Sequence, residues 1–269
     1  MHVLRLPPEL VSCIARYLNR AREILSLAMA NRQLFHILRP ALYRFNVRRR
    51  NSSALIWASQ KGAFKLAKIL ISYNADVNAV HEGKTPLMQA AICGSESVSR
   101  TLLDVGGILI NLQNKLGLSA LWYAAAHGHT AIVGQLLERE NIRTGCSDIS
   151  GGLTPLAIAA CNGLAEVVRV LLQAEQDDIN TPDRHGWTPI FHAIRCPRYS
   201  TEVTEILLSK STIDTSHRDH HGRTPVTYAT LRRRYHAVAL LLKMGADVNI
   251  EDIKERHHWT RRWLTRTCK

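Results

Sequence analysis

The stretch TPLAIAACNG, Thr154 to Gly163, decides the fold of this chain, because its features recur along the sequence. Thr154 is a typical helix N-cap, since its hydroxyl accepts a hydrogen bond from a backbone N–H that lacks a helical partner. Pro155 follows at the first helical position, where its missing N–H costs nothing and its fixed φ matches a helix. Gly163 readily adopts the positive φ that ends a helix. The stretch therefore predicts one short helix, followed by a second over the apolar run at residues 167–172.

Six copies of this stretch occur from Ser53 onward. They are SALIWA at Ser53, TPLMQA at Thr85, SALWYA at Ser119, TPLAIA at Thr154, TPIFHA at Thr188 and TPVTYA at Thr224, and they begin 32, 34, 35, 34 and 36 residues apart. This period and the TPLxxA signature resemble the ankyrin repeat, a β-turn and two antiparallel helices in about 33 residues. The resemblance implies an all-α solenoid of six repeats at residues 51–250, starting near 51, 83, 117, 152, 186 and 222.

Two of the six repeats depart from the pattern. In the fifth, Pro197 replaces the closing glycine and two extra residues lie between Thr188 and Leu207, so we expect a bulged turn between its helices. In the sixth, Arg233 takes the glycine position. Because arginine pays a steric cost at positive φ, the first helix there should run longer or end under strain.

Composition limits the number of domains, the location in the cell and the state of the cysteines. The chain has 269 residues, of which 46% are hydrophobic and 21% charged, as expected for one or two folded domains. It contains no apolar run of about 18 residues, and its N-terminus has no secretory apolar segment, so a cytoplasmic or nuclear location is expected. The six cysteines show no metal-binding or disulfide spacing and are expected to be reduced.

The net charge of +13 is concentrated at the two ends of the chain. Residues 1–50 carry a net charge of +8, residues 51–230 carry −1 and residues 231–269 carry +6. A groove that follows a phosphate backbone needs positive charge along its length, which the long middle segment does not supply. We therefore expect neither a nucleic-acid nor a membrane partner. The arginine cluster at residues 44–50 is interpreted as a solvated connector, with a nuclear import signal as the alternative.

Residues 4–46 predict a separate helical module. Leu10, Ile14 and Leu18 recur every four residues, and two further apolar stripes follow before Pro40. The ordered string LPPEL, ILSL, NRQL and LY is similar to an F-box, although Ala30 and Leu34 stand near positions where many members carry Cys and Trp. The resemblance, a combination found in filamentous fungi, implies docking onto the Skp-type adaptor of a cullin ligase. The residues it assigns to this contact are Leu6, Pro7, Leu10, Ile14, Leu18 and Leu27.

Variable positions of repeats five and six are the candidate surface for a target protein. Repeat tips and first-helix ends are the parts that an ankyrin stack presents to partners. In these two repeats they combine arginine, histidine and one tryptophan, which suits an acidic or phosphorylated segment. The alternative is a solvated basic face without a ligand. The candidate residues are Arg184, His185, Trp187, Arg195, His220, His221, Arg223 and Arg232.

Two groups of residues have the side-chain types of a metal site or of a catalytic site. His217, His220 and His221 beside Asp219 are metal-ligand types, but no second ligand pair with suitable spacing is evident, so no metal or other cofactor is expected. Cys196 and His192 lie four residues apart, yet no orienting third group or oxyanion site accompanies them. The sequence therefore predicts a binding protein and not an enzyme.

The segment at residues 251–269 does not complete a seventh repeat. Trp259 and Trp263 lie four residues apart among arginines, which predicts a short amphipathic helix that caps the last repeat, with membrane-surface binding as the alternative. Together these features predict a substrate-recognition subunit of an SCF-type ubiquitin ligase. The alternatives are a plain ankyrin scaffold whose N-terminal helices cap the stack, and a chromatin or nucleic-acid binder.

Overall fold

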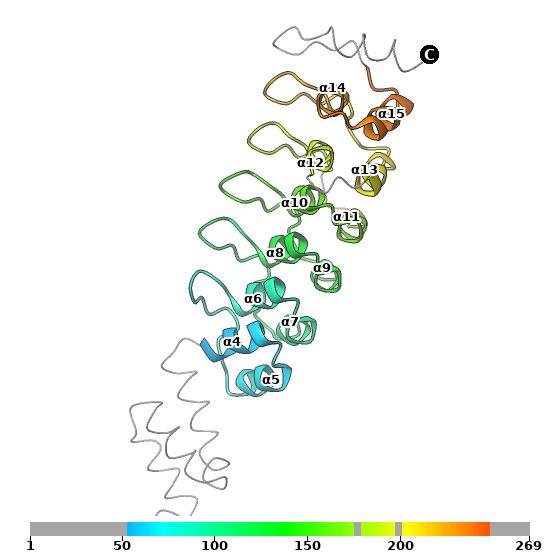
Figure 1. Cartoon of the computed structure of the whole chain (residues 1–269). Helices are drawn as coiled ribbons and strands as arrows, with labels where there is room; N and C mark the ends of the chain where they lie inside the picture. The colour runs from blue at the N-terminus through cyan, green and yellow to red at the C-terminus, as the bar shows by residue number, and fades with distance from the viewer. Residues whose placement is uncertain (1–52, 175–178, 197–200, 248–269) are drawn as a thin grey trace, which may run out of the picture. The chain divides into compact units, whose positions relative to one another are not determined.

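The structure is a computed structural model that describes residues 53–174, 179–196 and 201–247. These residues contain twelve α-helices and no β-strand, apart from one isolated bridge between His81 and Lys84 (Figure 1). The predicted all-α class is therefore confirmed. Among the described helices, none has the length and apolar character needed to cross a membrane.

Some of the predictions concern segments outside the described residues. These are the F-box-like module at residues 4–46 with its adaptor-binding residues, the arginine cluster at 44–50, the bulged turn that begins at Pro197, and the segment at 251–269. The chain divides into two compact units, Met1–Leu109 and Ile110–Lys269.

In the first unit, two helix pairs are described. The helices are α4 (Ser53–Lys61), α5 (Phe64–Ser72), α6 (Pro86–Cys93) and α7 (Glu96–Leu103). Helix α4 packs on α6 and α5 packs on α7, so the first helices form one layer and the second helices another. Leu55, Leu70, Leu87 and Leu102 are at most 2% exposed and form the core between these layers.

The second unit contains four helix pairs in the same two-layer arrangement (Figure 1). The first helices are α8 (Ala120–His127), α10 (Pro155–Asn162), α12 (Pro189–Arg195) and α14 (Pro225–Leu231). The second helices are α9 (Thr130–Leu137), α11 (Ala165–Leu171), α13 (Thr201–Leu208) and α15 (Tyr235–Lys243). Each helix packs on its counterpart in the next repeat, which buries the apolar side chains of both layers.

Threonine N-caps start most of the first helices, as the sequence predicts. The hydroxyl of Thr154 accepts a hydrogen bond from the N–H of Ala157 at 3.2 Å, and Thr85 and Thr224 cap α6 and α14 in the same way. Thr188 has extended N-cap backbone geometry, but its buried hydroxyl has no hydrogen-bond partner among the described residues. The N-cap is therefore weaker in the fifth repeat than in the fourth.

The ends of the first helices separate the repeats into two kinds. Gly128 and Gly163 close α8 and α10 in the left-handed region, at φ +78° and +71°. Arg233 adopts φ +56° after α14, so of the two expected outcomes the strained ending is the one found, and the helix is not extended.

Helix α12 ends without a left-handed residue at its C-cap. Its C-cap residue Cys196 has φ −41°. The guanidinium of Arg234, from the sixth repeat, donates hydrogen bonds to the carbonyls of Ile194 and Cys196 at 3.2 Å each. A side chain from the neighbouring repeat thus satisfies carbonyl groups that helix ends leave unpaired.

Candidate protein-interaction surface

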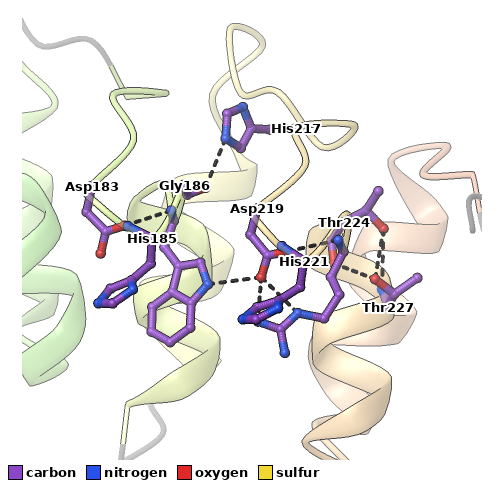
Figure 2. Close-up of polar contacts among 10 residues, drawn as sticks. Asp183, His185, Gly186, His217, Asp219, His221, Thr224 and Thr227 are labelled. Carbon is purple, nitrogen blue, oxygen red and sulfur yellow. Dashed lines mark hydrogen bonds and ion pairs between the residues drawn. The ribbon is translucent and has the colours of Figure 1, made fainter. Parts of the chain in front are cut away.

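An aspartate fixes the backbone of each tip in repeats four to six. In the sixth repeat, Asp219 Oδ1 accepts hydrogen bonds from the backbone N–H groups of His221 and Arg223 at 2.9 Å each (Figure 2). Asp183 Oδ1 accepts from the corresponding N–H groups of the fifth tip. In the fourth tip, the two oxygens of Asp148 accept separately from the N–H groups of Gly151 and Leu153. All three carboxylates are buried. The sequence pattern did not predict this role, although an aspartate stands five residues before both Thr188 and Thr224.

Backbone hydrogen bonds join the tips of the second unit into a continuous row. The N–H of Ile149 donates to the carbonyl of Leu116 at 2.8 Å. The next links run from Arg184 to Gly151 at 2.9 Å and from His220 to His185 at 3.1 Å. In the third tip, the Asn114 side-chain oxygen takes the place of the carboxylate and accepts from the N–H groups of Leu116 and Leu118. Each tip is therefore positioned by its own side chain and by its neighbour.

The tips of repeats five and six share a second link. The ring of His217 donates from Nε2 to the carbonyl of Gly186 at 3.0 Å (Figure 2). In the part of the chain that the structure describes, no group of three or more His, Cys, Asp or Glu side chains is arranged to hold a metal ion. His217 and Asp219, two of the metal-ligand types in the sequence, are both committed to these structural contacts.

A buried histidine–aspartate pair lies beneath the fifth tip. His192 Nε2 lies 3.0 Å from Asp183 Oδ2, and both side chains are 3% exposed. Burial opposes ionisation of Asp183, but hydrogen bonds from His192 and from two backbone N–H groups, with the charge of His192, lower its pKa. The His192 side chain therefore holds the tip. Cys196 contacts His192 through the backbone, where the Cys196 N–H donates a hydrogen bond to the His192 carbonyl at 2.9 Å.

Trp187 and Arg223 meet at the carboxylate of Asp219. Trp187 Nε1 donates to Asp219 Oδ2 at 3.0 Å, and Arg223 Nε donates to the same oxygen at 2.8 Å. Burial again opposes ionisation of Asp219, but these hydrogen bonds and the charge of Arg223 outweigh it and lower its pKa. Both predicted contact residues are half-buried, so they connect repeats five and six in addition to bordering the surface.

The other predicted arginines are exposed. The guanidinium carbon of Arg195 lies 5.0 Å from the Trp187 ring centroid, and that of Arg232 lies 5.3 Å from the Tyr228 centroid. The two rings are 5.5 Å apart and Tyr228 is buried. Stacking on an aromatic face holds a guanidinium without using its in-plane N–H donors.

Arg184, Arg195 and Arg232 form no ion pair with a carboxylate of the described residues. The predicted surface therefore has two groups of residues. Trp187 and Arg223 are half-buried and bonded to Asp219. The other predicted residues, which are the three arginines and His185, His220 and His221, are exposed. Chemically, donors that are held in place before a ligand arrives suit an anion, and Arg195 and Arg232 are held in this way on aromatic rings.

Comparison with known proteins identifies the repeat unit. A family model described as ankyrin repeats matches the chain in three copies, at residues 25–114, 105–183 and 175–252. Among solved structures, the ankyrin repeat protein EF0377 is 27% identical, with a TM-score of 0.65 over 71% of this chain and 96% of that one. The ankyrin domain of Bcl-3 is 22% identical, with a TM-score of 0.68 over 77% and 92%. These matches confirm the predicted ankyrin solenoid.

Curated relatives match about half of this chain. Alpha-latrotoxin-Lg1a of Latrodectus geometricus is 32% identical over 130 residues, which are 48% of this chain and 9% of the toxin. The probable E3 ubiquitin-protein ligase XBOS32 of Oryza sativa subsp. japonica is 29% identical over 178 residues, covering 55% of this chain and 36% of that protein. The chain thus spans well under half of the length of either relative.

Proposed function

The chain belongs to the ankyrin-repeat family, and on that premise we propose that it is the substrate-recognition subunit of an SCF-type E3 ubiquitin ligase. Ankyrin repeats mediate binding to protein partners, and in this chain repeats five and six would hold the protein to be modified. The chain itself would catalyse nothing. It would raise the effective concentration of a target lysine near the conjugating enzyme, in the cytoplasm or the nucleus.

The exposed arginines of repeats five and six support the target-binding half of this proposal. Arg195 and Arg232 lie on aromatic rings and keep their donors available, which suits an acidic or phosphorylated segment. In residues 179–196 and 213–234, every exposed charged side chain is an arginine, while Asp183 and Asp219 are buried and Asp214 is half-buried. These two ranges therefore present exposed positive charge and no exposed carboxylate.

The F-box-like string supports the adaptor-binding half. LPPEL with Leu10, Ile14 and Leu18 provides the apolar stripe through which an F-box would contact a Skp-type adaptor. The rice relative, which matches 55% of this chain, is itself named a probable E3 ubiquitin-protein ligase.

A pull-down with purified Skp adaptor tests the ligase link. The full chain should retain the adaptor, and Leu10→Asp with Ile14→Asp should abolish retention, because two charges would replace the apolar contact. Met244→Asp, at an exposed residue 47% accessible in the last repeat, is the matched control and should bind normally. Absence of binding, or binding that the double variant leaves intact, would falsify the ligase link.

One observation favours the alternative of a plain ankyrin scaffold. The first ankyrin match begins at residue 25, inside the segment at 4–46 that resembles an F-box, and it includes Leu27. If residues from 25 onward belong to the repeat array, they cover the first repeat and need no adaptor. The same pull-down decides between the two functions, since the scaffold alternative predicts no retention.

A further inference from the structure

Exposed side chains change in character along the row of tips in the second unit. Leu116 and Ile149, in the tips of repeats three and four, are 58% and 57% exposed. The equivalent positions in repeats five and six hold exposed Arg184, His185 and His220. Lys115, beside Leu116 in the third tip, is exposed as well. The first half of the row therefore carries the two aliphatic side chains together with one lysine, and the second half is cationic.

The two tips that carry these aliphatic side chains contact each other. The N–H of Ile149 donates to the carbonyl of Leu116, and a Cβ added at Gly117 would lie only 3.0 Å from the Ile149 side chain. Gly117 has φ +77°, so this close approach of the two tips depends on the glycine. Isolated surface leucines are common, whereas two exposed apolar side chains on tips that contact each other offer apolar area to a partner.

The cationic half continues directly from the aliphatic half. Arg184 donates its backbone N–H to Gly151 of the fourth tip, and His220 donates to His185 of the fifth. The same kind of backbone link thus runs through all four tips. A ligand that lies along this row meets the two aliphatic side chains and Lys115 in the first two tips, and exposed cationic or imidazole side chains in the last two.

We propose that the target is recognised through a two-part extended segment, with aliphatic residues on Leu116 and Ile149 and acidic or phosphorylated residues on Arg184, Arg195 and His220. This inference rests on the proposed target-binding role of the repeats. The aliphatic part gains affinity from burial of apolar area, and the anionic part fixes register and orientation.

The geometry also sets the length of the segment. Three repeat steps separate the third tip from the sixth, and helices pack about 8–10 Å apart, so the row spans about 24–30 Å. An extended chain covers about 3.3–3.6 Å per residue, which corresponds to about seven to nine residues between the outermost contacts. The aliphatic and anionic groups should therefore lie in one short linear motif.

Selection from a random peptide display library of about sixteen residues on the full chain tests this inference. The enriched peptides should combine aliphatic residues with Asp or Glu within about nine positions. Leu116→Ser with Ile149→Ser should weaken the selected peptides about tenfold at any ionic strength. Arg184→Glu with His220→Glu should weaken them at least as much, and the remaining affinity should lose most of its salt dependence.

Matched controls are available at the end of the last repeat. Met244→Ser removes an exposed apolar side chain, and Lys243→Glu reverses an exposed charge, both away from the tips. Neither should change affinity, and circular dichroism should show that every variant is folded.

The results separate this inference from the ligase proposal. Enriched peptides that are only acidic and indifferent to the Leu116 and Ile149 changes would overturn the two-part segment while leaving the basic target surface standing. Enriched peptides without acidic residues would overturn the two-part segment and the basic target surface. No enrichment at all would overturn both parts of the surface. Skp binding is measured independently through Leu10 and Ile14, so its failure does not affect the display result.

Discussion

Repeats four and six share one scaffold and differ in how they are closed and coupled. Each has a buried aspartate, a capping threonine and a proline at the first helical position. Repeat four ends its first helix at Gly163, and Asp148 bonds only within its own tip. Repeat six places Arg233 in the left-handed region, and Asp219 also accepts from Trp187 of repeat five.

In the fourth repeat, the N-cap, the left-handed closing glycine and the tip carboxylate follow rules that are local to its own sequence. Two side-chain hydrogen bonds that join it to the third repeat end on backbone carbonyls: Trp122 Nε1 donates to Leu153 at 3.0 Å, and Asn162 Nδ2 donates to Ala126 at 2.9 Å. In repeats five and six, the tip carboxylate also bonds across the boundary, between Asp219 and Trp187. The carbonyls that end α12 are satisfied by Arg234 of the next repeat, where the fourth repeat has a closing glycine. The predicted target-binding residues are concentrated at this boundary.

Removal of the Asp219 carboxylate should be the largest perturbation. Asp219→Ala leaves Arg223 without its ion-pair partner and the Trp187 indole N–H and two backbone N–H groups without acceptors. Loss of one member of a buried ion pair costs about 3–5 kcal/mol, which urea unfolding followed by circular dichroism would measure.

Asp148→Ala is the matched control in repeat four. It removes an acceptor from one hydroxyl and two backbone N–H groups and breaks no ion pair, so it should cost about 1–3 kcal/mol. Equal losses for the two variants would show that the contacts between repeats five and six add nothing to stability.

Acid should lower the stability of the folded chain by less than the alanine substitutions do, because protonation preserves the shape of each carboxyl group. The pKa values of Asp148, Asp183 and Asp219 are lowered from 3.8 in the folded chain. Their contribution is therefore complete above pH 3.8 and is lost as the pH falls through the lowered values. The melting temperature of the wild-type chain should exceed that of Asp183→Asn with Asp219→Asn by a constant amount above about pH 5.

Below pH 3.8 this difference in melting temperature should shrink. A difference that instead grows as the pH falls would mean that the carboxylates are destabilised by folding, contrary to the direction of their pKa shifts.

Exchange of the closing residues should give the smallest effects, with opposite signs. Arg233→Gly should stabilise the chain by about 1 kcal/mol, because glycine adopts φ +56° without the steric cost that arginine pays. Gly163→Ala should destabilise it by a similar amount, since φ is +71° there. Thermal unfolding of both variants measures the two changes in stability. Destabilisation by Arg233→Gly would show that the arginine side chain makes a compensating contact.

Much of the fold is predictable from local sequence. Thr154, Pro155 and Gly163 act through the backbone within a few residues, so their pattern alone predicts where helices begin and end. The role of the tip aspartates is harder to predict, because it depends on the conformation of a turn, and an acidic residue shortly before a glycine is common in loops of every kind. The candidate site was predicted as a set of positions, and spacing along the chain could not separate its bound members from its exposed ones.

The sequence by itself determined the repeat unit, the all-α class and the region where variable basic residues gather. These features follow from the spacing of residues along the chain, which requires no knowledge of contacts. Only the tertiary structure decided which of those residues are available to a partner. Arg223 and Trp187 are held by Asp219, whereas Arg195 and Arg232 lie on aromatic rings with their donors exposed. The reason is physical: the carboxylate that holds Trp187 comes from the next repeat, 32 positions away, and spacing within one repeat carries no information about it.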